Sequence, residues 1–474
     1  MKYIFLLISL FTFNFLQAQV TGVVKDAAGE PIPGANVFWM NTTNGVTTNE
    51  DGNFSIHKPA RSHMLVVSFI GFENDTIHVD KGNQQLDIVL REGVELSEVN
   101  VVTRKLGTMK LRTSVMNEDM ISSAELTRAA CCNLGESFVT NPSVDVSYSD
   151  AATGAKQIKL LGLSGTYVQM MTENIPNFRG AAAPYGLGYV PGPWMQSIQV
   201  SKGSSSVKNG YESITGQINV EFKKPQLPEA DWVSANLFAS STNRYEANAD
   251  ATVKLSKRWS TSLLAHYENE TKSHDSNDDG FVDIPRVEQY NVWNRWAYMG
   301  DHYVFQAGIK ALHETRNSGQ IAHGNTPSHD LYEIGIKTNR YEAFTKNAYI
   351  FDKEKNTNLA LILQGTLHNQ DANYGRKLYD VDQSNFYASL LFETELSKQH
   401  SLSAGLSFNY DGYDQNYRLT NQAEEGLTKK FVKESVPGAY VQYTFNLNDQ
   451  LMLMGGIRGD YSSEYGFFVT ARAH

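Results

Sequence analysis

The sequence has few cysteines, no basic tract and no long apolar run beyond its N-terminal segment. Its only cysteines are adjacent, Cys131 and Cys132, so they cannot form the disulfides across loops that are common in exported proteins. A formal net charge of −10 argues against a nucleic-acid partner. No later segment approaches the roughly 18 apolar residues of a membrane-spanning helix. Strands remain as a way to cross a membrane, because a β-barrel needs no such run.

The N-terminus has the pattern of an export signal. Lys2 precedes an apolar run, Tyr3–Phe15, which is followed by Leu16-Gln17-Ala18. We expect residues 1–18 to be a secretory signal peptide that is cut before Gln19. The leucine three positions before the cut departs from the usual small residue, and an uncleaved signal anchor is the alternative. No lipobox cysteine follows.

From about residue 231 onwards, short polar turns alternate with long polar loops. Outer-membrane barrels are connected in this way, by tight periplasmic turns and extended extracellular loops. The short connections are Ser256–Arg258, Gly300–His302, Asp352–Thr357, Ser397–Gln399 and Asn446–Gln450. The expected long loops are Lys272–Val287, Glu314–Asp330, Gln370–Gln383 and Asp411–Glu434.

The segments between these connections have one apolar and one polar face. In Ser401–Tyr410 every even position is apolar and every odd one is small or polar. Since side chains at i and i+2 point the same way, such a strand can meet lipid on one face and a barrel lumen on the other. A large soluble β-sandwich also alternates, but it gives no reason for the loop asymmetry. An aromatic content of 11% suits the aromatic girdles of a barrel.

Residues 19–92 read as a small all-β module. Strand patterns flank Asp51-Gly52, a typical hairpin turn. The segments Gly22–Val37, Thr48–Phe54 and Val67–Phe72 resemble the motifs of the carboxypeptidase-regulatory-like (transthyretin-like) module. We expect a β-sandwich without a catalytic site.

Residues 93–109 look like a polar connector that contains a β-branched strand. Such a strand makes sense where a partner supplies the pairing strand. The run Leu96–Thr103 resembles the TonB box of TonB-dependent receptors, and an ordinary linker strand is the alternative. The coupling residues implied by the resemblance are Glu98, Val99, Asn100, Val101 and Val102.

Residues 110–225 resemble the plug domain of the same receptors. Ser122–Leu126 should open a short helix that Cys131–Asn141 continues. Ile158–Pro176 is similar to the core plug hairpin, and Ile198–Val220 is similar to a signature with glycines at fixed offsets, which allow tight backbone turns. The latter segment lacks the Gly-Lys-Ser/Thr ending of a phosphate-binding loop.

The order of these segments implies a mainly β protein: a small N-terminal sandwich, an α+β plug and an antiparallel transmembrane barrel from residue 231 to 474. The resemblance implies import of a scarce solute across the outer membrane, driven by a TonB-type partner, with the N-terminal module in the periplasm. The solute could be a siderophore, a metal chelate or a similar small ligand. A non-transporting structural or adhesive surface protein and a signalling receptor are the alternatives. No catalytic constellation suggests an enzyme, and no cofactor is required.

About eleven strands can be counted from Asp231 to Tyr461, with a twelfth starting at Phe467. Plugged transporters close with about 22 strands. We therefore expect the chain to hold about half a barrel.

One loop has the oxygen donors of a calcium site. Asp275, Asn277, Asp279 and Asp283 occupy relative positions 1, 3, 5 and 9 around Gly280, as in a calcium-binding loop. Arg286 stands where an EF-hand has its bidentate glutamate. Structural calcium is thus one hypothesis, and a solvated acidic loop tip is the other.

Two further groups are candidate ligand contacts. Cys131, Cys132, Met170 and Met171 carry soft sulfur donors that suit copper or zinc, although core packing explains them equally simply. The Gly/Pro/aromatic loop from Arg179 to Trp194 would face the extracellular mouth in a plug. From it we expect Arg179, Tyr185 and Tyr189 to contact the solute, and the alternative is a loop packed on the barrel wall.

Overall fold

The computed structural model describes residues 19–90 without 27–28, 41, 43, 60–62, 70–71, 73 and 80–84, and residues 108–474 without 111–116, 129–131, 140, 226–231, 322–330, 421–425 and 448–450. These residues fall into two compact units, one within Met1–Lys105 and one within Leu106–His474. The expected signal peptide and the expected coupling segment Glu98–Val102 lie outside the described residues.

The first unit is a sandwich of two small sheets, as the sequence predicts. One sheet has the order β4(Asn53–His57)-β1(Gln19–Lys25)-β7(Gln85–Val89), and the other has the order β3(Gly45–Thr47)-β2(Asn36–Trp39)-β5(Met64–Ser68)-β6(Asp75–His78). Alternate residues of β1 and β2 point inward, so Val24, Val37 and Trp39 are fully buried between the sheets. Gly52 has φ +73° in the Asp-Gly turn before β4, a conformation that glycine adopts without strain.

The second unit begins with a central domain, residues 108–225. Its six-stranded sheet has the order β13-β12-β15-β14-β9-β8, and β10 and β11 form a separate hairpin. Its elements are β8(Thr108–Lys110), β9(Asn117–Ser122), α2(Ser123–Arg128), η1(Leu134–Glu136), β10(Val144–Asp150), β11(Ala155–Leu160), η2(Gly165–Tyr167), β12(Val168–Thr172), β13(Ile175–Pro176), η3(Gly180–Ala182), η4(Gly186–Tyr189), η5(Gly192–Trp194), β14(Met195–Lys202), η6(Val207–Asn209) and β15(Gly216–Phe222).

The short helix predicted after Ser122 is present as α2, but its predicted continuation is wrong. Within Cys131–Asn141 the described residues form only the single turn η1. Asn133 has an extended backbone and its side chain accepts a hydrogen bond from the Glu136 amide. An asparagine that caps a turn in this way starts a new element instead of extending the preceding one.

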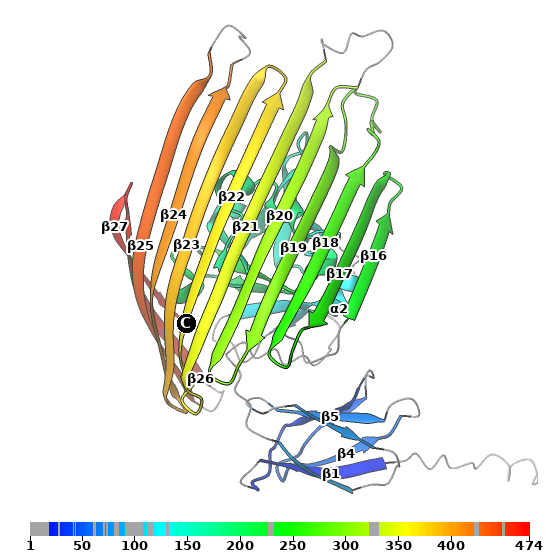
Figure 1. Cartoon of the computed structure of the whole chain (residues 1–474), viewed down its shortest axis with the longest axis vertical. Coiled ribbons are helices and arrows are strands. Elements are labelled where there is room, and N and C mark those ends of the chain that lie inside the picture. The colour runs from blue at the N-terminus through cyan, green and yellow to red at the C-terminus, as the bar shows by residue number, and fades with distance from the viewer. Residues whose placement is uncertain are drawn as a thin grey trace, which may run out of the picture. The chain divides into compact units, whose positions relative to one another are not determined.

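Twelve antiparallel strands, each paired with its neighbours in sequence, form the second part of this unit, here called the wall (Figure 1). They are β16(Trp232–Ala239), β17(Arg244–Lys254), β18(Trp259–Glu270), β19(Arg286–Met299), β20(Tyr303–Gly319), β21(Glu333–Asp352), β22(Thr357–Tyr374), β23(Lys377–Ser397), β24(His400–Arg418), β25(Thr428–Leu447), β26(Leu451–Ser462) and β27(Gly466–Ala473). The count agrees with the sequence. No helix among the described residues is long and apolar enough to span a membrane.

The wall has an apolar outer face and a largely polar inner face. In β19, Val292 and Trp296 are exposed on the outside, whereas the alternate residues Asn291 and Arg295 are buried on the inside. Figure 1 shows the central domain behind the curved wall. An apolar exterior and a polar interior are the pattern of an outer-membrane barrel wall.

The prediction of a long loop at residues 370–383 is wrong, and the loops that follow β20 and β24 are shorter than predicted. Residues 370–383 are mostly strand, because β22 continues to Tyr374 and β23 starts at Lys377 after the two-residue turn Gly375-Arg376. Likewise β20 continues to Gly319 and β24 to Arg418. The polar composition of these segments suggested loops. Polar residues nevertheless form β-strands when both neighbouring strands offer backbone hydrogen-bond partners.

Candidate functional site

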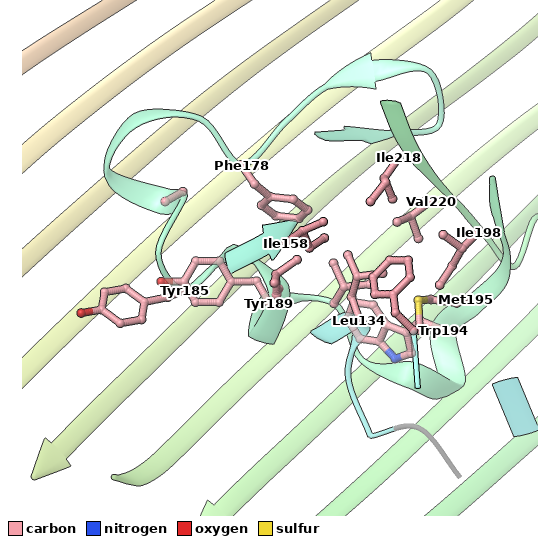
Figure 2. Packing of buried hydrophobic residues seen from close by; sticks show 14 of the residues in the cluster. Leu134, Ile158, Phe178, Tyr185, Tyr189, Trp194, Met195, Ile198, Ile218 and Val220 are labelled. Carbon is pink, nitrogen blue, oxygen red and sulfur yellow. The ribbon is translucent and has the colours of Figure 1, made fainter. Parts of the chain in front are cut away.

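The central domain packs against the inner face of the wall, and the two share one apolar core. Trp293, Leu312 and Ile336 of the wall belong to the same buried cluster as Trp194 and Phe222 of the central domain. The rings of Phe222 and Trp293 meet edge to face with centroids 4.5 Å apart, a favourable arrangement. Figure 2 shows the central-domain residues of this cluster in front of the wall strands.

A buried ion pair links the β12–β13 turn to the wall. Glu173 lies at the tip of the turn with φ +52°, and Asn174 follows with φ +61°. The Glu173 carboxylate lies 2.5 Å from the guanidinium of Arg295 on β19, and its backbone oxygen accepts a 2.6 Å hydrogen bond from Lys346 on β21. Burial alone would raise the pKa of Glu173, but the charges of Arg295 and Lys346 hold it below its ordinary value.

A second polar junction, at Asn177, lies four residues beyond Glu173 in the chain. Asn177 accepts a 2.6 Å hydrogen bond from Arg340 and donates a 3.0 Å hydrogen bond to Glu342, both on β21. A cavity adjoins the two junctions, with Glu173, Glu342 and Lys310 among its lining residues. The turn and the wall therefore meet through charges and polar groups as well as through the apolar core.

Tyr185 and Tyr189, two predicted solute contacts, lie in this interface. Tyr189 is fully buried, and its backbone oxygen accepts hydrogen bonds from Asn291 at 3.0 Å and from Lys310 at 3.1 Å. The Arg316 guanidinium lies over the ring of Tyr185, 4.9 Å from its centroid, a cation–π arrangement. Both rings are labelled in Figure 2. The structure thus places both residues against the wall, and their contact with a solute stays a prediction.

Arg179, the third predicted contact, joins two parts of the central domain to the wall. Its guanidinium lies 2.5 Å from the Glu212 carboxylate and 3.3 Å from that of Asp411 on β24, and it donates a 2.7 Å hydrogen bond to Asn409. Burial alone would lower the pKa of Arg179, but the two carboxylates raise it above its ordinary value. Binding of an anionic solute by this cation would therefore compete with two existing carboxylates.

Arg472, close to the end of β27, holds the loop that precedes β15. Its guanidinium donates to the backbone oxygens of Ser205 at 2.8 Å, Ser206 at 3.2 Å, Tyr211 at 3.1 Å and Ser213 at 3.0 Å. Glu173, Arg295 and Arg472 were not predicted from the sequence. A charged residue on the polar face of a strand was the available signal, but it does not identify the partner.

The structure describes three of the four sulfur-bearing residues that the sequence offers as soft-metal ligands. Cys131 lies outside the described residues. Cys132 is buried, and burial raises the pKa of its thiol, which disfavours the thiolate that binds metals. Met171 is fully buried on β12, and Met170 packs against the apolar core. Soft-metal binding stays a prediction.

Hydrogen bonds between its own residues stabilise the acidic loop between β18 and β19. The Asp275 carboxylate accepts from the amides of Asp279 at 3.1 Å and Gly280 at 2.9 Å, and Asp283 accepts from the amide of Ser276 at 2.7 Å. Among the residues that the structure describes, no three His, Cys, Asp or Glu side chains are grouped to hold a metal ion. Calcium binding stays a prediction. Calorimetric titration with Ca²⁺ tests it, with Asp275→Asn as the variant and Asp278→Asn as the matched control.

Two family models match the chain. Residues 20–102 match the CarboxypepD_reg-like domain, and residues 110–217 match the TonB-dependent Receptor Plug Domain. The two matches follow one another in the order that the motifs predict.

The curated relatives are TonB-dependent receptors from two bacteria. The receptor SusC of Bacteroides thetaiotaomicron is 28% identical over 245 residues, which cover 48% of this chain and 24% of SusC. Receptor P39 of Formosa agariphila is 39% identical over 100 residues, which cover 20% of this chain and 10% of P39. The matched segments thus span about a quarter or less of these relatives.

Solved receptor structures share the fold. The alcaligin receptor FauA of Bordetella pertussis superposes with a TM-score of 0.61 at 14% identity, covering 80% of this chain and 63% of FauA. The copper transporter OprC gives a TM-score of 0.60 at 13% identity, covering 75% of this chain and 58% of OprC. At these identities the likeness establishes the fold alone.

Proposed function

The chain belongs to the TonB-dependent outer-membrane receptors that carry an N-terminal CarboxypepD_reg-like domain, and from this premise we propose that it acts in the energy-coupled import of a scarce solute across the outer membrane. The family comprises receptors and transporters rather than enzymes. The solute is a small ligand such as a metal chelate, a siderophore or an oligosaccharide. Two solved structures of the same fold are described as an alcaligin receptor, FauA, and a copper transporter, OprC.

One observation carries the proposal: a folded central domain sits on the polar face of an amphipathic wall. A protein that only anchors to the membrane or adheres to surfaces has no use for a separate domain inside its barrel. Buried ion pairs such as Glu173–Arg295 hold the domain in place. Import then requires an external force that shifts the domain relative to the wall.

A TonB-type protein in the periplasm supplies that force by pairing with the segment Glu98–Val102. Pairing of two extended strands depends on backbone hydrogen bonds, and proline removes one donor. Val99→Pro should therefore abolish coupling, whereas Lys105→Pro, outside the segment, serves as the matched control. The N-terminal domain lies on the periplasmic side in this arrangement.

The test is uptake by cells that carry the chromosomal gene in its natural setting. Accumulation of ⁵⁵Fe-loaded 2,3-dihydroxybenzoate and of ¹⁴C-maltohexaose is measured in the wild type, the Val99→Pro strain and the Lys105→Pro strain. We expect Val99→Pro to abolish accumulation of the solute that the wild type takes up, and Lys105→Pro to leave it unchanged. Cross-linking from a cysteine at position 99 to the TonB-type protein should be lost upon energy depletion.

Uptake that survives Val99→Pro at the wild-type rate would contradict import that is driven through the segment Glu98–Val102. An adhesive or structural role is favoured instead if surface attachment depends on the protein and is unaffected by Val99→Pro. A signalling role is favoured if Val99→Pro abolishes ligand-induced transcription without changing accumulation.

A further inference from the structure

The cavity beside the two polar junctions has room for one small molecule. Its volume is about 20 Å³, and a single water molecule needs roughly 10–15 Å³ of cavity volume. Its lining joins the central domain, through Glu173 and Phe222, to strands β19, β20 and β22 of the wall, through Trp293, Lys310 and Gln364. An occupant of this cavity would therefore touch both parts of the unit at once.

Two of the lining residues carry a buried oxygen that accepts no hydrogen bond within the described part of the chain. These atoms are Oε1 of Gln364 on β22 and Oε2 of Glu173 in the β12–β13 turn. Gln364 is 5% exposed and Glu173 is 2% exposed, so bulk solvent does not supply the donor. The Lys346 ammonium lies 3.9 Å from Glu173 Oε2, which is too far for a hydrogen bond. Because an unsatisfied buried acceptor costs free energy, both oxygens require a donor inside the cavity.

The Lys310 ammonium supplies a donor to the same cavity. Lys310 is 4% exposed, and its Nζ donates to the Tyr189 backbone oxygen at 3.1 Å. The Glu342 carboxylate lies 3.7 Å from this nitrogen. An ammonium has three N–H groups, and these two neighbours occupy at most two of them. Lys310 therefore retains an N–H group for an acceptor in the cavity.

This set of donors and acceptors distinguishes between small occupants. A halide ion only accepts hydrogen bonds, so it would leave the oxygens of Gln364 and Glu173 without a donor. A metal cation would be repelled by the like charge of the Lys310 ammonium in a buried site. A buried water typically makes about three hydrogen bonds, and here it would donate two and accept one. Water is thus the occupant that satisfies all three groups.

We propose that the cavity is a binding site for one ordered water molecule, which donates to Gln364 and Glu173 and accepts from Lys310. The water bridges the turn and the wall beside the direct pair of Glu173 with Arg295. A hydrogen bond through water is nearly as favourable as a direct one, but its water is replaced by another when the turn moves. The site does not depend on the proposed import or on the identity of the solute.

A crystal structure of the protein, purified in detergent from outer membranes, tests the proposal. We expect one peak of difference density within roughly 3.2 Å of Gln364 Oε1, Glu173 Oε2 and Lys310 Nζ. Gln364→Leu removes one acceptor at similar volume and should abolish the peak or lower its occupancy. Gln370→Leu is the matched control and should leave the peak unchanged, because Gln370 lies on the same face of β22 and is also 5% exposed but is not part of the lining.

The absence of a peak in the unaltered protein would overturn the proposal. So would an anomalous signal at this position from crystals grown in bromide, since it would identify a halide site. A peak of full occupancy in the Gln364→Leu variant would show that the glutamine does not bind the water, which also contradicts the proposed site.

Hydrogen exchange in solution measures the bridge independently of crystals. Loss of one hydrogen bond should quicken amide exchange at residues 171–177 about two- to tenfold in Gln364→Leu and leave it unchanged in Gln370→Leu. Equal exchange rates in the two variants would contradict a water that bridges the turn to the wall. Should Gln364→Leu fail to fold, the density in the unaltered protein decides.

Discussion

The Glu173 carboxylate and the Arg295 guanidinium lie 2.5 Å apart, and their side chains retain only 3% and 2% of their exposure to solvent. One residue comes from a turn of the central domain and the other from the wall, 122 positions later in the chain. Two buried charges that belong to different parts of a protein tie those parts together, since separating them in a dry interface leaves each charge uncompensated.

Removing the cation of this pair should weaken the attachment of the central domain. We expect Arg295→Met to lower the free energy of unfolding by about 3–5 kcal/mol, because a buried carboxylate loses its partner. The matched control is Arg258→Met, which breaks the exposed pair with Asp301 and should cost less than about 1 kcal/mol. Guanidinium titration followed by tryptophan fluorescence measures both, since Trp293 adjoins Arg295. Equal losses in the two variants would contradict a stabilising buried pair.

The same pair makes the attachment depend on pH. The pKa of Glu173 is held below its ordinary value by Arg295 and Lys346, so the ionised form is favoured in the folded state. The resulting stability is fully present above the ordinary glutamate pKa, about 4.3, and is lost as the pH falls through the lowered pKa. Unfolding titrations from pH 7 down to pH 3 should show this decline, and Glu173→Gln should reduce its slope. An unchanged slope in that variant would assign the decline to other carboxylates.

Gly216 of the glycine signature is predicted to tolerate no side chain. A Cβ at this position would overlap the Ser201 backbone oxygen and a Leu160 methyl group. Gly216→Ala should therefore cost about 1–3 kcal/mol through overpacking, measured by the same denaturant titration. A Cβ added at Gly365 on β22 would meet no heavy atom within 4 Å, so Gly365→Ala is the control. Equal stability of the two variants would show that the β14–β15 region relaxes around the added methyl group.

Local patterns in the sequence predicted the parts of the fold that depend on neighbouring residues. Alternation along Ser401–Tyr410 identified a wall strand, and Asp51-Gly52 identified the turn before β4, although β3 and β4 belong to different sheets. Strand ends were less predictable, because residues 370–383 are polar yet paired on both sides. Contacts between the central domain and the wall could not be predicted, since nothing local distinguishes Arg295 from any other arginine on a polar strand face.

Arg472 gives the clearest case of a contact hidden from the sequence, because it reaches Ser205, 267 positions earlier. Lysine keeps the charge at this site but lacks the planar fork that serves several oxygens at once. We expect Arg472→Lys to release the loop at residues 204–215 while the rest of the central domain stays attached through Glu173 and Arg179. Hydrogen exchange should then quicken in that loop and remain slow in β12. Arg418→Lys, whose native guanidinium donates to the Arg376 backbone oxygen at the exposed end of β24, is the matched control. Unchanged exchange in the loop of the Arg472→Lys variant would mean that other contacts, such as Ser206 with Gln442, suffice to hold it.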